Sequence, residues 1–306
     1  MADAKEDNAA PTARGFRGLD FYAMRVLRHC RIPGHLRLAT LPRIDKLLAA
    51  GRIDKHVRFS PADDVELDVW LIHGRGPAAA ASPGTVLIIH GLWDSKARFF
   101  DLGEIMASRG FNVALPDLRR HGASTGEHTT FGALEKRDLA ALMTHLRATG
   151  DAPGPLWVFG FSMGAAIAVQ YSAIDPLVRG TVAGAPFADG PSITRRVVPL
   201  MSKEKFQAVW VRAAEIAGFD PQDTSTVQAA GKLNCPLIVI HGMLDLIVPY
   251  SQGHAVFEAA PQPKKLYSVP WAGHPSLLLK SRSWFADRIE EVMAMGKTST
   301  AKEDRP

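Results

Sequence analysis

The sequence predicts an α/β protein with a mostly parallel sheet and helices on both of its faces. Short, continuous apolar runs, typical of strands buried on both sides, recur along the 306 residues. Several are followed by segments of helical pattern, and strands that alternate with helices pair in parallel through right-handed crossovers. The hydrophobic share of 46% and charged share of 22% are ordinary for a soluble domain and exclude disordered, collagen-like and coiled-coil chains.

The elements follow in order along the chain. Residues 56–60 and 65–73, on either side of the turn-like PADD, predict a hairpin that forms an antiparallel N-terminal edge of the sheet. Three strand and helix pairs come next, at 85–91 with 96–109, 111–117 with 131–150, and 155–162 with 163–173. Further short strands are expected at 179–186, 235–242 and 264–270, before a C-terminal helix that includes 283–295.

The domain organisation follows from this rhythm. Residues 56–295 form one α/β domain, and the stretch of about fifty residues at 187–234 is longer than a crossover requires, which predicts a small helical lid. Residues 1–14 and 296–306 are expected to be disordered tails.

The segment 15–55 is expected to be basic and helical. Residues 13–58 carry eleven Lys or Arg against three acids, whereas the whole chain has a net charge of +5. We expect a helix packed on the main domain with its arginines in solvent, and the alternative is peripheral contact with a membrane or an acidic partner. No nucleic-acid partner is expected, because the basic run lacks a recognised binding motif.

The two cysteines and the apolar runs indicate a cytoplasmic protein. Cys30 and Cys235 lie 205 positions apart, which implies no disulfide framework. The acidic, polar N-terminus lacks an export signal, and no apolar run approaches the roughly 20 residues of a membrane span. No cofactor or metal is expected, because no glycine-rich phosphate loop and no metal-ligand spacing occurs.

A candidate nucleophile lies in Gly-Phe-Ser-Met-Gly at 160–164, which matches the G-x-S-x-G nucleophile elbow. The motif alone is weak, but a buried strand precedes it and a helix follows it, as the elbow requires. The pattern therefore predicts covalent catalysis by Ser162, and the alternative is a glycine-rich turn that only positions a helix. A serine rather than a carboxylate at this position argues against a dehalogenase.

A serine needs a base and a carboxylate that orients it, in the chain order Ser, Asp or Glu, His. Asp245 follows the strand at 235–242, and His274 follows the strand at 264–270. The carboxyl ends of parallel strands share one edge of a sheet, so both can reach Ser162. Taken alone, either residue could be a turn or capping residue. The rival base His254 lies in an apparent helix, and His241, which ends a buried strand, is expected to be structural.

The negative oxygen of a tetrahedral intermediate needs hydrogen-bond donors. We expect the backbone amide of Met163, directly after the nucleophile, and that of Leu92 in the loop after the strand at 85–91, with Trp93 as the fallback. Trp93 is also expected to line the substrate pocket, which these apolar residues make hydrophobic.

The chain resembles α/β-hydrolases, in particular Bem46-like and prolyl-oligopeptidase-like serine hydrolases. The matching segments are IIHGLWDS, PDLRRHGASTGEHTTFGALEKRDL, FGFSMGAA, VIHGMLDLIVP and WAGH, between Ile88 and His274. The resemblance implies Ser162 as nucleophile, His274 as base, Asp245 as orienter, and the Leu92 and Met163 amides as oxyanion hole. It also implies a structural loop that shapes the pocket rim, with Asp117, Arg119, His121, Gly122, Ser124 and Gly126. Departures from the family pattern are Ala165, small enough to preserve activity, and Pro275, which stiffens its loop.

The predicted function is hydrolysis of carboxylic esters of a small-molecule acyl substrate, through an acyl-enzyme on Ser162. A peptidase or thioesterase would use the same three residues, and a noncatalytic binding protein on a hydrolase scaffold is the remaining alternative. The natural substrate, its chain length and the oligomeric state are left open by the sequence.

Overall fold

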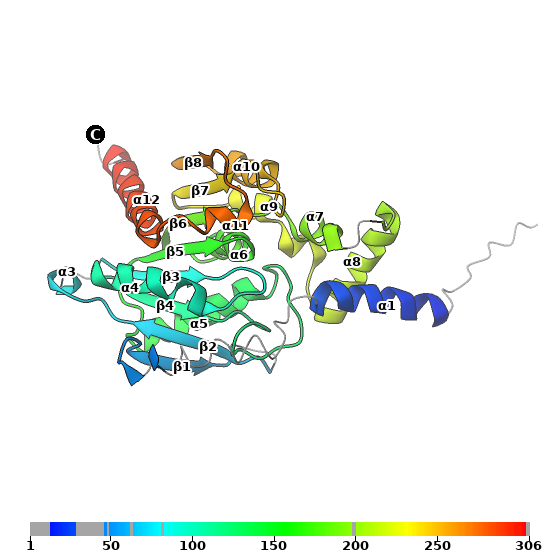
Figure 1. Cartoon of the computed structure of the whole chain (residues 1–306), viewed down its shortest axis with the longest axis horizontal. Helices are drawn as coiled ribbons and strands as arrows, with labels where there is room; N and C mark the ends of the chain where they lie inside the picture. Colours follow the sequence, from blue (N-terminus) through cyan, green and yellow to red (C-terminus); the bar gives the residue numbers. More distant parts are fainter. Residues whose placement is uncertain are drawn as a thin grey trace, which may run out of the picture.

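A single mixed sheet forms the centre of the molecule in the computed structural model, which describes residues 13–28, 46–47, 49–61, 64–80, 83–197 and 200–303 (Figure 1). Within these ranges the sheet has eight strands in the order β1-β2-β4-β3-β5-β6-β7-β8. The strands are β1 (Lys55–Phe59), β2 (Leu67–Ile72), β3 (Thr85–Ile89), β4 (Asn112–Pro116), β5 (Leu156–Phe161), β6 (Val178–Gly184), β7 (Leu237–Gly242) and β8 (Lys264–Val269).

The predicted fold class is confirmed. β1 pairs antiparallel with β2, and β2 pairs antiparallel with β4, while every pairing from β4 to β8 is parallel. The strand order reverses around β3, which lies between β4 and β5, and ligands bind at such switch points in open α/β sheets. Ile89 of β3 is in register with Gly160 of β5, so the loops that leave these two strands begin side by side.

Helices cover both faces of the sheet. Alternate residues of β3 enter opposite cores, with Val86 on one side and Leu87 on the other. One face is covered by α4 (Phe100–Ser108) and α12 (Arg282–Glu303), and the other by α5 (Glu135–Ala148), α6 (Met163–Ser172), α9 (Thr226–Ala230) and α10 (Tyr250–Ala259). Shorter helices are α3 (Pro77–Ala80), η1 (Lys96–Phe99) and α11 (His274–Leu277).

The connection between β6 and β7 is a helical insertion, in the place where the sequence predicts a lid. It contains α7 (Gly190–Thr194), η2 (Arg195–Val197), α8 (Lys203–Ala217), η3 (Pro221–Thr224) and the core helix α9. Helix α8 begins at the cap Ser202, whose hydroxyl accepts a hydrogen bond from the Lys205 amide, and ends at Gly218 in the left-handed conformation. Helices α7 and α8 stand away from the sheet, beyond its helical layers (Figure 1).

Helix α1 (Ala13–Arg28) begins two residues before the expected basic segment, within the expected tail, and packs along α8 (Figure 1). Val26 and Leu27 of α1 are fully buried in the core cluster that also contains Trp210 of α8, and Asp20 pairs with Arg212 of α8 at 2.6 Å. We expected the helix to pack on the main domain, but its main partner is the insertion. A helical pattern shows which face is apolar and not which element covers it.

The end of α1 is fixed to the loop between β4 and α5. The carbonyl of Leu27 accepts a hydrogen bond from the Thr129 amide at 3.1 Å, and the carbonyl of Arg28 accepts one from the Arg120 guanidinium at 2.8 Å. These donors satisfy carbonyls that a helix end leaves without partners. Helix α1 therefore joins the insertion to the main domain.

The chain ends differ in part from expectation. Helix α12 continues to Glu303, whereas a tail is expected from residue 296, and no proline within 296–303 interrupts the helix. Residues 1–12 of the expected N-terminal tail and residues 29–45 of the basic segment lie outside the described residues. Among the helices that the structure describes, none is long and apolar enough to cross a membrane.

Candidate active site

Ser162 lies on a strained turn between β5 and α6, with φ of 56° and ψ of −119°. A non-glycine residue adopts such a backbone only when its surroundings hold it there. The Ser162 amide donates to the Gly184 carbonyl at 2.7 Å, and a Cβ at Gly160 or Gly164 would collide with neighbouring backbone. Ala165, where the resembling family often has glycine, fits fully buried at the start of α6.

The structure brings the predicted base and orienter to Ser162. His274 Nε2 lies 2.9 Å from Ser162 Oγ, and His274 Nδ1 lies 2.6 Å from Asp245 Oδ2. Because an ionised carboxylate only accepts, Nδ1 carries the proton and Nε2 is free to accept from the serine hydroxyl. His274 is the first residue of α11, and Pro275 directly after it suits the first turn of that helix.

Asp245 is held by backbone amides on the oxygen that does not face His274. Its Oδ1 accepts hydrogen bonds from the amides of Ile247 at 2.9 Å and Val248 at 2.8 Å. The side chain is buried, which removes competing water. Asp245 therefore presents its second oxygen, Oδ2, to the imidazole in a fixed direction.

The two other histidines considered from sequence have different places. His241 is fully buried at the end of β7, where its Nε2 lies 2.9 Å from the Val248 carbonyl and 3.6 Å from Asp245 Oδ2. Burial lowers the pKa of His241 below its ordinary value, so it stays neutral and supports the Asp245 loop. His254 lies on α10, as expected, with its Nε2 3.6 Å from Glu258.

The loop after β3 passes directly beside the nucleophile. A Cβ at Gly91 would lie 3.4 Å from the Cβ of Ser162, and Leu92 follows immediately. His90 fixes this loop, because its Nε2 accepts from the Leu118 amide at 3.0 Å and its Nδ1 donates to the Gly91 carbonyl at 2.8 Å. On the other side of Ser162, Met163 is the first residue of α6, and first-turn amides have no acceptor within their helix.

A buried ion cluster lies where this loop ends and η1 begins, at Lys96. The Lys96 ammonium is 3% exposed, forms ion pairs with Asp68 and Asp117, and lies 4.8 Å from the centre of the Trp70 ring. Burial tends to raise the pKa of Asp117, but the Lys96 charge and its hydrogen bonds outweigh this and keep that pKa below its ordinary value. The amide of Lys96 also donates to Asp117 at 2.8 Å, which ties η1 to the end of β4.

The loop after β4 is structural, but it does not form the pocket rim. Arg119 makes two hydrogen bonds to Asp138 at 2.6 and 2.7 Å, and its carbonyl lies 2.9 Å from His121 Nδ1. Burial lowers the pKa of His121 to about 3. Ser124 donates to the Asp117 carbonyl at 2.7 Å.

The resemblance implied that this loop shapes the pocket rim, yet none of its six residues named above is among those that line the cavity. The physical reason is burial: ion pairs hold Asp117 and Arg119 in the interior, and His121 and Ser124 are also buried.

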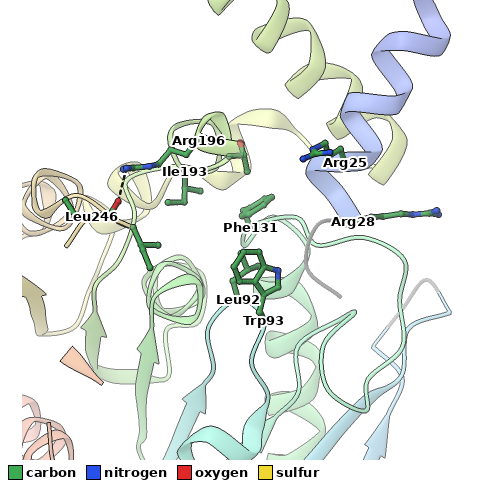
Figure 2. Close-up of a pocket in the computed structure, with 10 residues that line it drawn as sticks. Arg25, Arg28, Leu92, Trp93, Phe131, Ile193, Arg196 and Leu246 are labelled. Atoms are coloured by element: carbon green, nitrogen blue, oxygen red, sulfur yellow. Dashed lines mark hydrogen bonds between the residues drawn. The ribbon is translucent and has the colours of Figure 1, made fainter. Parts of the chain in front are cut away.

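A cavity of about 800 Å³ opens beside the Leu92 loop (Figure 2). Its lining residues are Arg25, Arg28, Leu92, Trp93, Phe131, Ile193, Thr194, Arg196, Leu246 and Ile247. Trp93, expected in the pocket, lies in its wall with the uncommon φ of 59°. Leu92 was also expected there, whereas the other lining residues were not predicted from the sequence. Leu246 and Ile247 beside Asp245 could have been found from their position next to a candidate catalytic residue, whereas Arg25 gave no such signal.

No candidate metal site accompanies these residues. Over the ranges that the structure describes, no three His, Cys, Asp or Glu side chains gather in a way that could hold a metal ion. The site brings together a hydroxyl, an imidazole and a carboxylate in one hydrogen-bonded series. These are the groups that acyl transfer requires.

Comparisons with known proteins agree with the geometry. The model of the family described as serine aminopeptidase, S33, matches residues 80–225, a range that includes Ser162. YqkD of Bacillus subtilis is 26% identical over 246 residues, covering 75% of this chain and 77% of YqkD. An uncharacterised protein of Mycobacterium tuberculosis strain H37Rv is 26% identical over 245 residues, covering 78% of each chain.

Solved structures share the fold. The esterase Pf2001 of Pyrococcus furiosus superimposes with a TM-score of 0.63 at 23% identity, covering 79% of this chain and 92% of the esterase. Est1E of Butyrivibrio proteoclasticus has a TM-score of 0.61 at 16% identity, with 79% and 99% coverage. With the elbow, the strand order and the family match over residues 80–225, these likenesses show the α/β-hydrolase fold and support an α/β-hydrolase enzyme of the serine hydrolase type.

Proposed function

We propose that this enzyme hydrolyses carboxylic esters of small molecules through an acyl-enzyme on Ser162. The observation that carries the proposal is the hydrogen-bonded series from Ser162 Oγ through His274 to Asp245, with distances of 2.9 and 2.6 Å. A weak hydroxyl nucleophile becomes effective when a base within hydrogen-bonding distance takes its proton and a third group orients that base.

The reaction proceeds in two halves. Ser162 Oγ attacks the ester carbonyl carbon while His274 Nε2 takes its proton, and the amides of Leu92 and Met163 stabilise the resulting oxyanion. His274 then returns the proton to the leaving alcohol as the C–O bond breaks, which leaves an acyl-enzyme. Water, deprotonated by His274, attacks this acyl group, and the proton goes back to Ser162 as the acid leaves.

The cavity favours an ester over the peptide alternative. An aminopeptidase binds the positive amino terminus of its substrate, and a carboxylate is the natural partner for that charge. Among the described lining residues there is no Asp or Glu, and there are three arginines. Pf2001 and the acetyl xylan esterase of Thermoanaerobacterium, which has a TM-score of 0.59 at 15% identity and 78% and 81% coverage, are esterases by name.

The test is hydrolysis of p-nitrophenyl esters from acetyl to palmitoyl, beside amino-acid p-nitroanilides and acyl thioesters. Ser162→Ala should lower kcat by about 10⁵ to 10⁶-fold, because the nucleophile is lost. Ser108→Ala, an exposed position on α4, is the matched control and should retain wild-type rates. Turnover of anilides or thioesters alone would replace the ester assignment, and full activity of Ser162→Ala would refute the nucleophile.

A fluorophosphonate probe separates an enzyme from a binding protein without knowledge of the substrate. Covalent modification of Ser162, measured by mass spectrometry of the peptide that contains it, is the expected result. Absence of labelling, together with absence of turnover, would favour a noncatalytic hydrolase-like protein.

A further inference from the structure

Among the described residues that line the cavity, the charged ones are all arginines. Arg25 and Arg28 come from α1, and Arg196 comes from η2 of the insertion. In Figure 2 the arginines lie around the apolar side chains, which include Trp93 and Phe131 between them. The cavity therefore has an apolar interior and a positively charged border.

The three arginines differ in how far their charge is compensated. Arg28 forms an ion pair with Glu127 at 2.6 Å and points away from the apolar lining in Figure 2. Arg196 donates to the backbone carbonyl of Leu246 at 2.8 Å, which orients the guanidinium without neutralising it. Arg25 has no carboxylate partner among the residues that the structure describes. Two cations at the cavity are thus available to an anion.

The helix that carries Arg25 is held in place by contacts of its own. Asp20 on α1 pairs with Arg212 on α8, while Leu27 and Arg28 accept hydrogen bonds from the main domain. These contacts fix α1 in the free protein. When Arg25 binds a ligand, only its side chain therefore has to become ordered. Preorganisation of this kind lowers the cost of binding.

The cavity also adjoins segments that carry the candidate site residues. Leu92 and Trp93 follow Gly91, which lies beside Ser162, and Leu246 and Ile247 follow Asp245 directly. The side of the cavity at Leu92 is therefore the one nearest the candidate nucleophile. The apolar lining suits a carbon chain between that side and the arginines.

We propose that the substrates are esters with a fixed negative charge, a carboxylate or a phosphate, separated from the reacting carbonyl by an apolar chain. Arg25, which has no carboxylate partner among the described residues, is the principal site for the anion, Arg196 on the other side of the cavity is a second one (Figure 2), and the apolar residues bind the chain. The inference rests on the proposed function for its reaction and on the cavity for its specificity. The same anionic group occurs in soluble acid monoesters and in lipid headgroups.

An ordinary structural role for Arg25 is the competing explanation. A cation in the last turn of a helix stabilises the helix dipole, and Arg25 and Arg28 both lie in that turn of α1. This role predicts no discrimination between charged and neutral substrates. Selectivity therefore distinguishes the two explanations.

The first experiment compares two substrates of equal acyl length, the p-nitrophenyl monoester of adipic acid and p-nitrophenyl hexanoate. The anionic ester should have the higher kcat/KM, and the ratio should fall as NaCl approaches ~1 M, where the screening length is about 3 Å. Arg25→Gln and Arg196→Gln should each lower that ratio about fivefold. Arg58→Gln, on the exposed edge strand β1 and paired with Glu66, is the matched control and should leave the ratio unchanged.

The second experiment measures binding without turnover. Calorimetric titration of Ser162→Ala with hexyl phosphate and with hexanol should show tighter binding of the phosphate, and adding Arg25→Gln and Arg196→Gln should remove the difference. Equal affinity for the two ligands, or a preference that survives both arginine substitutions, overturns the inference. Loss of ester turnover with a retained anion preference would instead reject only the proposed reaction.

A third experiment distinguishes a lipid headgroup from a soluble anion as the negatively charged group of the substrate. Sedimentation with phosphatidylcholine vesicles, with and without phosphatidylglycerol, should increase with the anionic lipid and depend on Arg25 if the substrate is a lipid. Binding of monomeric hexyl phosphate without vesicle binding supports a soluble anion. Absence of both overturns the proposal.

Discussion

The sheet edge that holds Ser162 and the elements that line the cavity, chiefly α1 and the insertion, are built in different ways. At the sheet edge, Asp245 and His274 are buried, and each faces a fixed hydrogen-bond partner. Around the cavity, Arg25 is exposed, and the lining side chains come from α1, the insertion and three loops, those that hold Leu92, Phe131 and Leu246. The contrast indicates that the reaction geometry is rigid, while specificity depends on side chains that are free to change.

One loop serves both regions. The backbone amides of Ile247 and Val248 hold Asp245, whereas the side chains of Leu246 and Ile247 line the cavity. Backbone atoms are common to all residue types, so substitutions of these side chains can alter the cavity while Asp245 keeps its donors. The following predictions, from the largest effect to the smallest, test how separate the two regions are.

Asp245→Asn should lower kcat about 10⁴-fold, the largest effect among these variants. An amide can donate to His274 Nδ1 and so favours the tautomer with its proton on Nε2, where it cannot accept from Ser162. Steady-state kinetics on a p-nitrophenyl ester measures the loss, and thermal unfolding checks the fold. Asp287→Asn, an exposed residue on α12, is the control. A loss below tenfold would contradict the role of Asp245 as orienter.

Lys96→Met should lower the free energy of unfolding by about 3–5 kcal/mol, because Asp117 would remain buried without its main counter-charge. Denaturant unfolding measures the change. Lys55→Met removes the partly exposed ion pair with Asp151 and should cost less than about 1 kcal/mol. An equal loss of unfolding free energy in the two variants would show that the Lys96 cluster stabilises the fold no more than the Lys55–Asp151 pair does.

Stability should fall as the pH is lowered from about 6.5 towards 3, in part through His121. Its folded pKa of about 3 lies below the unfolded value of 6.5, so in this window the unfolded state binds a proton that the folded state does not. The cost is roughly 2 kcal/mol at pH 5 for this one group. Unfolding of wild type and His121→Phe across the window should show a shallower pH dependence for the variant. Parallel curves would rule out His121 as the source.

Val26→Asp should detach α1, because a charge would replace a fully buried side chain in the core cluster that α1 shares with α8. The expected result is a KM for hexanoyl esters raised about fivefold, with a smaller change for acetyl esters that do not fill the cavity. Met24→Ala, a partly buried neighbour, is a milder control. An equal effect on both esters would show that α1 supports the reacting atoms as well as the cavity.

The sequence indicated the fold and the order of the site residues, because both depend on local patterns. Apolar runs of strand length and the glycines around Ser162 are visible without a structure. Their positions after strands put Ser162, Asp245 and His274 on one sheet edge, where the structure brings them within hydrogen-bonding distance. The catalytic roles of these residues and of the Leu92 and Met163 amides stay predictions until the variants are measured.

The sequence by itself thus determined the α/β layering, the hairpin edge and the helical insertion, since burial imposes a periodicity that each segment carries alone. Only the tertiary structure decided that β3 lies between β4 and β5, that Lys96 joins Asp68 to Asp117, and that α1 packs on α8. The physical reason is distance along the chain. Contacts such as Asp20 with Arg212 depend on which surfaces meet when the layers close, and no local pattern specifies the partner.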